Sequence, residues 1–123
     1  MITNKIIKSL SYGVITMGVI HIIATFSPLI AGQLEPLSES GRWAFTYMSL
    51  MCGALLILGG SVVIMLADKV KEHQFLRCPY LFTVWMLAID GVLAAVMMPH
   101  NPCAWVIMAL TVALLSGIGK NKK

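Results

Sequence analysis

Apolar residues dominate four long segments of the chain, and short polar stretches separate these segments. The apolar segments run over about residues 10–31, 43–67, 78–98 and 103–119. A bilayer core about 30 Å thick requires about 20 helical residues, and spans of about 17–25 residues are usual. Backbone amides in lipid must find partners within their own segment, so each segment is predicted to be a helix. The pattern therefore predicts an all-α fold, a four-helix transmembrane bundle that occupies residues 1–123 as a single domain.

The polar breaks between the segments indicate how the helices connect. Residues 32–41 contain Gly, Pro, Ser and two Glu, and residues 68–77 are the most charged stretch of the chain. The third break is the tight turn Pro99-His-Asn-Pro102, which makes the last two helices antiparallel neighbours. Pro28 is expected to kink or end the first helix early, because proline cannot continue the helical hydrogen bonds. The resulting topology is up-down-up-down.

Composition supports lipid as the solvent of this chain. The sequence is 59% hydrophobic and 11% charged, and its mean hydropathy is +0.87. A soluble domain is usually about a quarter charged. The net charge of +4 comes largely from lysines near the two termini, not from a basic face of the kind that binds nucleic acid. We therefore expect a lipid bilayer as partner and no nucleic acid.

The distribution of Lys and Arg predicts the orientation in the membrane. Two of the nine precede the first helix, three lie in the second break, and three follow the last helix. The first break has only Arg42, and the third break has none. Because basic residues are concentrated on the cytoplasmic side of membrane proteins, both termini are predicted to be cytoplasmic. The expected location is the bacterial inner (cytoplasmic) membrane, as a multi-pass protein.

Two ionisable residues interrupt the apolar segments near mid-membrane. His21 and Asp90 each lie about 18 Å from the predicted cytoplasmic end of their helix, at about 1.5 Å per residue. Thr25 lies one turn beyond His21 on the same helical face. A charged Asp at the bilayer centre costs at least about 2.5–3.5 kcal/mol, so such residues usually face a partner or a wet cavity. Two interpretations stay open: a buried hydrogen bond that joins two helices, which is favoured, and a proton-linked pair within a cavity.

A second polar group is expected at the outer face. It comprises Arg42 before the second helix and His100 in the Pro-His-Asn-Pro turn, with Glu35 and Glu39 in the first break. An Arg beside a helix end is most often an anchor in the headgroup region. The spacing of these residues does not match a metal site, and the three cysteines form no CxxC pair. We therefore predict no metal and no cofactor.

Several short motifs resemble those of a known family. They are Gly18-Val-Ile-His21, Arg42-Trp-Ala-Phe45, Gly53 with Gly59-Gly60, and Met98-Pro99 before Trp105. Together they resemble an uncharacterised bacterial family of small four-helix integral membrane proteins that is broadly similar to the DoxX-like group. The resemblance implies a four-helix fold and singles out His21 and Arg42, but not Asp90. DoxX-like proteins are sometimes linked to quinone or sulfur oxidation, which no residue pattern here supports independently.

The sequence favours a structural or accessory role in the membrane over an enzymatic one. Such a protein acts through helix packing, as a homo-oligomer or with another membrane protein. The alternative is a proton-coupled carrier of a small solute that uses His21 and Asp90. Small multidrug exporters also have four helices at this length, but they carry an acidic residue in the first helix, where this chain has His21. A membrane oxidoreductase component is a third and weaker alternative.

Overall fold

The computed structural model describes residues 2–119, and within this range every regular element is helical. In chain order the elements are α1 (Ile2–Thr25), α2 (Pro28–Leu34), α3 (Glu39–Ala67), the 3-10 turns η1 (Lys69–Lys71) and η2 (Gln74–Leu76), α4 (Arg77–Met97) and α5 (Pro102–Gly119). Three of the helices are long and apolar enough to cross a membrane: α1, α3 and α4, the last together with η2. The all-α prediction is thus confirmed.

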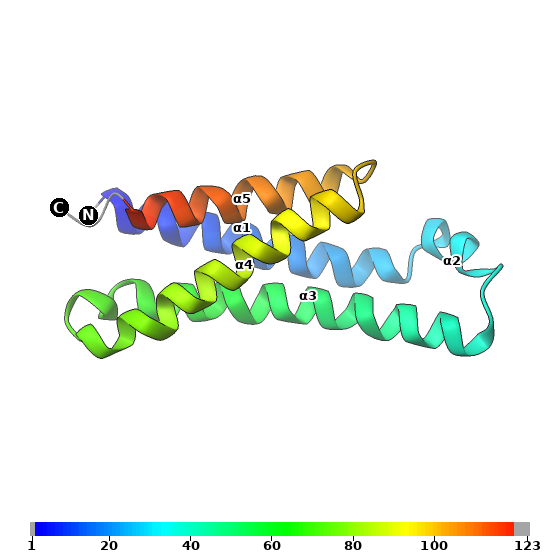
Figure 1. The fold of residues 1–123 in the computed structure, drawn as a ribbon, viewed down its shortest axis with the longest axis horizontal. Helices are drawn as coiled ribbons and strands as arrows, with labels where there is room; N and C mark the ends of the chain where they lie inside the picture. Colours follow the sequence, from blue (N-terminus) through cyan, green and yellow to red (C-terminus); the bar gives the residue numbers. More distant parts are fainter. Residues whose placement is uncertain (1, 120–123) are drawn as a thin grey trace.

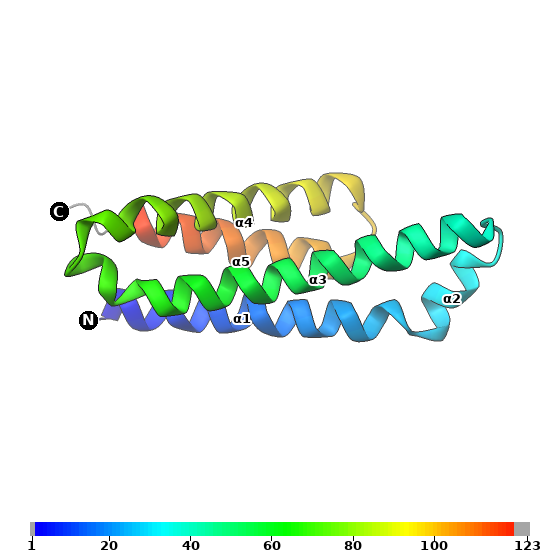
Figure 2. The same cartoon turned by 90° about the horizontal axis from the view of Figure 1, so that it is seen from below.

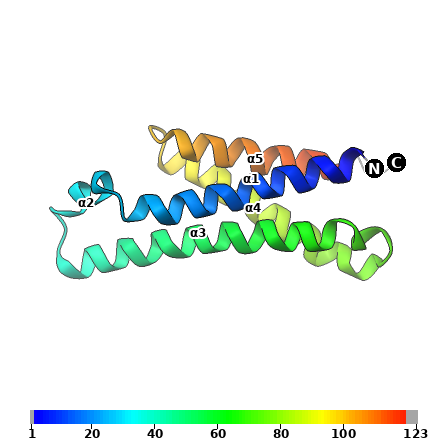
Figure 3. The ribbon, with the colours of Figure 1, turned by 180° about the vertical axis from the view of Figure 1, so that it is seen from behind.

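The four longer helices lie side by side in the order α3, α1, α5, α4, and α4 also contacts α3 (Figures 1 and 2). At one end, which we call the Asp68 end, α1 begins, α5 ends, and α3 turns into α4. At the opposite end, the α2 end, α2 joins α1 to α3 and a short turn joins α4 to α5 (Figure 3). Helix α4 leaves α3 at the Asp68 end and crosses towards α5, so α3 and α4 diverge towards the α2 end.

The predicted boundaries of the first helix are wrong at both ends. Helix α1 begins at Ile2 instead of residue 10, because Lys5 and Lys8 continue the helix beyond the apolar segment. Hydropathy marks the lipid-facing part of a helix, and lysine is itself a good helix former. The helix ends at Thr25, and Pro28 occupies the first turn of α2 after the N-cap residue Ser27. The expected effect of Pro28 is confirmed.

The second helix also begins earlier than predicted, at Glu39 instead of residue 43. The hydroxyl of Ser38 accepts a hydrogen bond from the backbone N–H of Gly41 at 3.2 Å and caps the helix. Glu39 places a negative charge in the first turn, where the helix dipole favours it. The other two helices, predicted at 78–98 and 103–119, agree with α4 and α5 to within one residue.

Glycine and serine let the backbones of α1 and α3 approach closely. A Cβ atom on Gly18 would lie 2.8 Å from the carbonyl oxygen of Gly53, and one on Gly60 would lie 2.9 Å from that of Ser11. The small residues Ser11, Gly18 and Thr25 recur every seven residues on α1, opposite Gly60, Gly53 and Ser49. Close backbone approach stabilises helix pairs in lipid, where apolar burial gives no drive to associate.

The interior is small and partly polar, whereas the exterior is strongly apolar. Ser11 and Thr111 are fully buried and donate hydrogen bonds to carbonyl oxygens of their own helices, Ile7 and Ile107. Large apolar side chains instead cover the outside, among them Ile23, Leu58, Met65, Phe82 and Val96, all more than half exposed. This distribution is the opposite of that in a water-soluble fold and is consistent with a membrane protein.

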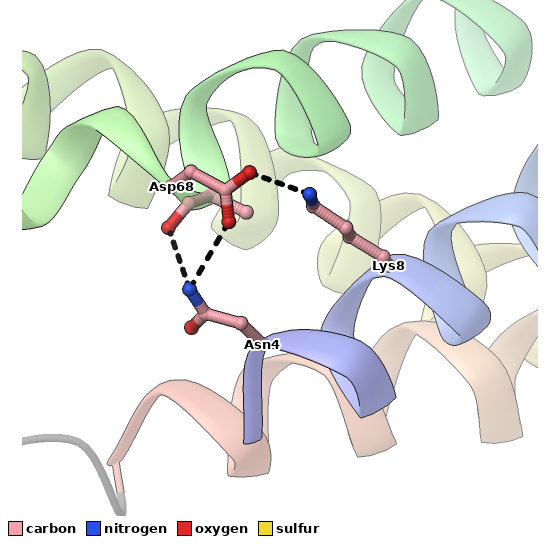
Figure 4. A network of polar contacts seen from close by, with 4 residues as sticks. Asn4, Lys8 and Asp68 are labelled. Carbon is pink, nitrogen blue, oxygen red and sulfur yellow. Dashed lines mark hydrogen bonds and ion pairs between the residues drawn. The ribbon is translucent and has the colours of Figure 1, made fainter. Parts of the chain in front are cut away.

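A polar cluster closes the Asp68 end (Figure 4). The carboxylate of Asp68, just after α3, pairs with Lys8 of α1. The side-chain amide of Asn4 donates to the same carboxylate at 3.2 Å and to the carbonyl oxygen of Ala67 at 3.5 Å. The hydrogen bond from Lys8 is the main reason why the pKa of Asp68 lies below its usual value of 3.8. These contacts fix the register between the start of α1 and the end of α3.

Candidate functional site

His21 lies near the end of α1 and is hydrogen-bonded to the neighbouring helix α3. Its Nε2 atom lies 3.2 Å from the hydroxyl of Ser49, and that hydroxyl lies 2.7 Å from the hydroxyl of Thr25. Thr25 also donates to the backbone carbonyl oxygen of His21, at 2.9 Å. The three side chains therefore form a closed set of hydrogen bonds that joins α1 to α3. Thr25 stands beside His21, on the face where the sequence predicts it.

The direction of these hydrogen bonds fixes the tautomer of His21. A hydroxyl group has only one proton, and that of Thr25 is used for the carbonyl oxygen of His21. Ser49 must therefore donate to Thr25, which leaves no Ser49 proton for the imidazole. It follows that Nε2 of His21 carries a proton and donates it to Ser49. Nδ1 is then the ring nitrogen that is left to exchange a proton.

The Nδ1 atom of His21 has no hydrogen-bond partner within residues 2–119. In the same part of the chain, some side-chain nitrogens and oxygens of buried and half-buried residues are out of reach of solvent. Each of these atoms has a hydrogen-bond partner. Since His21 is half-buried, its Nδ1 must be accessible from outside. His21 lines a cavity of about 730 Å³ at the α2 end, bounded by α1, α2, the first turns of α3 and the α4–α5 turn. We call this the polar cavity, and it provides the access to His21.

Asp90 lies on α4 and does not pair with His21. Within the described residues, no hydrogen bond or ion pair joins its carboxylate to another side chain. Helices α1 and α4 are not among the helix pairs that pack extensively against each other. The direct hydrogen bond between His21 and Asp90 that the sequence favours is therefore not present among the described residues.

Asp90 opens onto a different space from His21. It lies at one end of a groove of about 340 Å³ between α3 and α4, which we call the α3–α4 groove. The groove continues from Asp90 past Thr83 and Phe82, towards the Asp68 end. Its other walls are apolar residues of α3, such as Leu55 and Val62. His21 and Asp90 thus line two different hollows, and the groove beside Asp90 is bordered by exposed apolar side chains such as Phe82.

The outer-face candidates Arg42 and His100 are at the α2 end but do not form one site. Arg42 is exposed on the first turn of α3 and does not line the polar cavity. His100 lies in the α4–α5 turn and does line it, so His21 and His100 face the same space from different depths. The turn is held by hydrogen bonds from Trp105 Nε1 to the Pro99 carbonyl oxygen and from the Cys103 N–H to Asn101, at 2.9 and 3.0 Å. No three His, Cys, Asp or Glu residues within 2–119 gather as metal ligands do.

Ser49 is the functional residue that sequence reasoning missed. Its type and spacing from Gly53 indicate only close packing of a helix. The heptad spacing of Ser11 and Gly18, opposite Gly60 and Gly53, would pair Thr25 with Thr46 and not with Ser49. The sequence therefore carries no signal that identifies Ser49, and only the structure shows its contact with Thr25.

Comparisons of the chain with family models, with curated proteins and with solved structures found no match.

Proposed function

We propose that the protein is a four-helix integral membrane protein in which α1, α3, α4 and α5 all span the bilayer. Helix α5 is the shortest of the four, with 18 residues. At about 1.5 Å per residue it measures about 27 Å, close to the thickness of about 30 Å of a bilayer core. It is strongly apolar and packs antiparallel to α4. The resemblance to DoxX-like proteins supports the same four-span topology.

The proposed orientation places the Asp68 end in the cytoplasm of a bacterial cell, with the protein in the inner membrane. Lys5, Lys8, Lys69, Lys71 and Arg77 lie at that end. The predicted C-terminal basic residues, Lys120, Lys122 and Lys123, lie outside the described residues. Arg42 alone lies at the α2 end. Fusions of a periplasmic phosphatase and of a cytoplasmic fluorescent protein after Leu37, Glu72 and His100 test the topology, because only the Glu72 fusion should fluoresce.

The function that this geometry supports best is the carriage of a small solute coupled to protons. One observation carries it: His21 and Asp90, the two ionisable residues within the apolar helices, each line a hollow of their own. The polar cavity gives His21 access from the α2 end, and the α3–α4 groove leads from Asp90 past Thr83 and Phe82 in the direction of the Asp68 end.

Reconstituted protein on a solid-supported membrane tests this function. We expect a pH jump to drive a current with at least one member of a panel of small carboxylates, neutral amides and amines. Asp90→Asn should abolish the current while the circular dichroism spectrum is kept. Glu72→Gln, a carboxylate removed from the loop after η1, is the matched control. A current that persists in Asp90→Asn, or no current with any solute, argues against the carrier.

A structural or accessory role is the second candidate, and the hydrogen bonds among His21, Ser49 and Thr25 support it. They join α1 to α3 just where the glycine contacts bring the two backbones together. In this role the protein acts through a partner, which is a second copy of itself or another membrane protein. Native mass spectrometry from mild detergent distinguishes the candidates. A stable complex with a protein, together with a wild-type phenotype of Asp90→Asn cells, favours the accessory role.

A further inference from the structure

The ionisable residues that line the polar cavity restrict the charge of its occupant. Among the described residues, none of the Asp, Glu, Lys or Arg side chains lines this cavity. The basic groups that do line it are the imidazoles of His21 and His100, whose ring nitrogens can accept a proton. A cationic solute would find no carboxylate in these walls. An anionic solute would find two imidazoles, one at mid-membrane and one at the mouth.

The position of the hydrogen-bonding groups restricts the shape of the occupant. At its deep end the cavity presents His21, Thr25 and Ser49, and at its mouth Gln33, His100 and Asn101. The walls between them are apolar, formed by residues such as Ile20, Phe45 and Ile107. A volume of about 730 Å³ falls within the usual range of about 300–1,000 Å³ for small-molecule sites. The occupant therefore combines an apolar body with a polar group that reaches the deep end.

The hydroxyl protons at the deep end already take part in hydrogen bonds, whereas one ring nitrogen of His21 does not. Both hydroxyl protons, those of Ser49 and Thr25, are used within the closed set of hydrogen bonds. Nδ1 of His21 is accessible and has no partner within residues 2–119. When a weak acid enters, its proton passes from the carboxyl oxygen to Nδ1. The products are an imidazolium and a carboxylate side by side, and the imidazolium remains held by Ser49 through Nε2.

We propose that the polar cavity binds small organic acids with an apolar body and that the carboxylate pairs with His21. This inference names the class of solute that the proposed carrier transports. It rests on the carrier function only for what happens to the acid after it has bound. Binding itself depends on the cavity and His21 alone.

Three probes that share one ring test the charge preference: benzoate, benzamide and benzylammonium. Isothermal titration is performed in phosphatidylcholine nanodiscs at mildly acidic pH, which increases the fraction of the aromatic acid that still carries its proton. We expect benzoate to bind at least about tenfold more tightly than benzamide, equivalent to about 1.4 kcal/mol, and benzylammonium to give no heat above empty nanodiscs. Equal or tighter binding of benzylammonium overturns the proposal, as does the absence of benzoate binding.

Two variants assign the site. His21→Gln should remove the preference for benzoate over benzamide, whereas His73→Gln, in the exposed loop between η1 and η2, should keep it. Ala24→Phe adds a ring to the cavity wall without changing the hydrogen bonds of His21, so it should block benzoate even if His21→Gln folds poorly. Benzoate binding that survives both His21→Gln and Ala24→Phe places the site elsewhere and refutes the proposal.

The failures of this inference and of the carrier function are distinguishable. If benzoate binds but no carboxylate gives a current, the organic-acid binding site is supported and the carrier function is refuted. If only amines give a proton-driven current, the carrier function is supported and the organic-acid site is refuted.

Discussion

The hydroxyl of Ser49 lies 3.2 Å from Nε2 of His21 and links α3 to this histidine of α1. Because Ser49 in turn donates to Thr25, the imidazole is held in one orientation and one tautomer. Asp90, which the sequence suggests as the partner of His21, forms no hydrogen bond or ion pair with it among the described residues.

We expect Ser49→Ala to lower the free energy of unfolding by about 0.6–1.7 kcal/mol, the range measured for polar contacts between membrane helices. The substitution removes both hydrogen bonds between α1 and α3 at this level. Ser61→Ala is the matched control, because the Ser61 hydroxyl bonds only to the Ile57 carbonyl of its own helix, at 2.7 Å. Reversible unfolding in mixed micelles measures both, and equal losses would contradict the inter-helix role of Ser49.

A double-mutant cycle separates direct from indirect partners of His21. For His21→Ala with Ser49→Ala we expect a coupling energy above about 0.5 kcal/mol, as for residues in one hydrogen-bond network. For His21→Ala with Asp90→Ala the coupling should be smaller, since no hydrogen bond joins the pair. A larger coupling energy for His21 with Asp90 than for His21 with Ser49 would show that His21 and Asp90 pair directly.

Asp90→Asn should fold at least as stably as the wild type, while the proposed proton-driven current is lost. A carboxylate near the bilayer centre is costly, and here no hydrogen bond within the described residues offsets that cost. Thermal unfolding followed by circular dichroism measures the stability. A clear loss of stability in Asp90→Asn would instead indicate that the carboxylate supports the fold.

Gly53→Ala should destabilise the protein by about 1–3 kcal/mol, the usual cost of overpacking a close-packed interior. The new methyl group would lie 2.5 Å from Ile22 Cγ1 and 2.9 Å from the Gly18 carbonyl oxygen. Gly32→Ala is the control, because nothing lies within 4 Å of a Cβ atom at that position of α2. If both variants unfold at the same denaturant concentration, the close approach of α1 and α3 is not tight.

The Asp68 end should give the protein a measurable acid sensitivity. The hydrogen bond from Lys8 lowers the pKa of Asp68 below 3.8 in the folded state, so its stabilising contribution is present above 3.8. That contribution is lost as the pH falls through the lowered pKa. The stability difference between wild type and Asp68→Asn should therefore shrink on acidification, whereas Glu72→Gln should show no such convergence. A difference that is constant with pH would refute the role of the Asp68 carboxylate.

The sequence predicts the helices well because lipid imposes long apolar segments and proline ends them. It locates His21, Thr25 and Asp90 because ionisable and hydroxyl side chains stand out among apolar neighbours. It misplaces the ends of α1 and α3, where Lys5, Lys8 and Glu39 are helical but not apolar. Ser49 escapes notice because its role depends on the register between two helices, and the pattern of one helix does not determine which residue faces His21.

The close pairing of α1 with α3 has a consequence for biogenesis. In the four-span arrangement proposed above, both helices are complete before α4 has been synthesised, so the first hairpin can leave the translocon with the hydrogen bonds of His21 already formed. The hydroxyls of Ser49 and Thr25 and Nε2 of His21 then enter the lipid already hydrogen-bonded. Asp90 follows in the second hairpin and finds no hydrogen-bonding partner waiting. The order of synthesis thus places the hydrogen-bonded His21 in the membrane first and the unpaired carboxylate of Asp90 last.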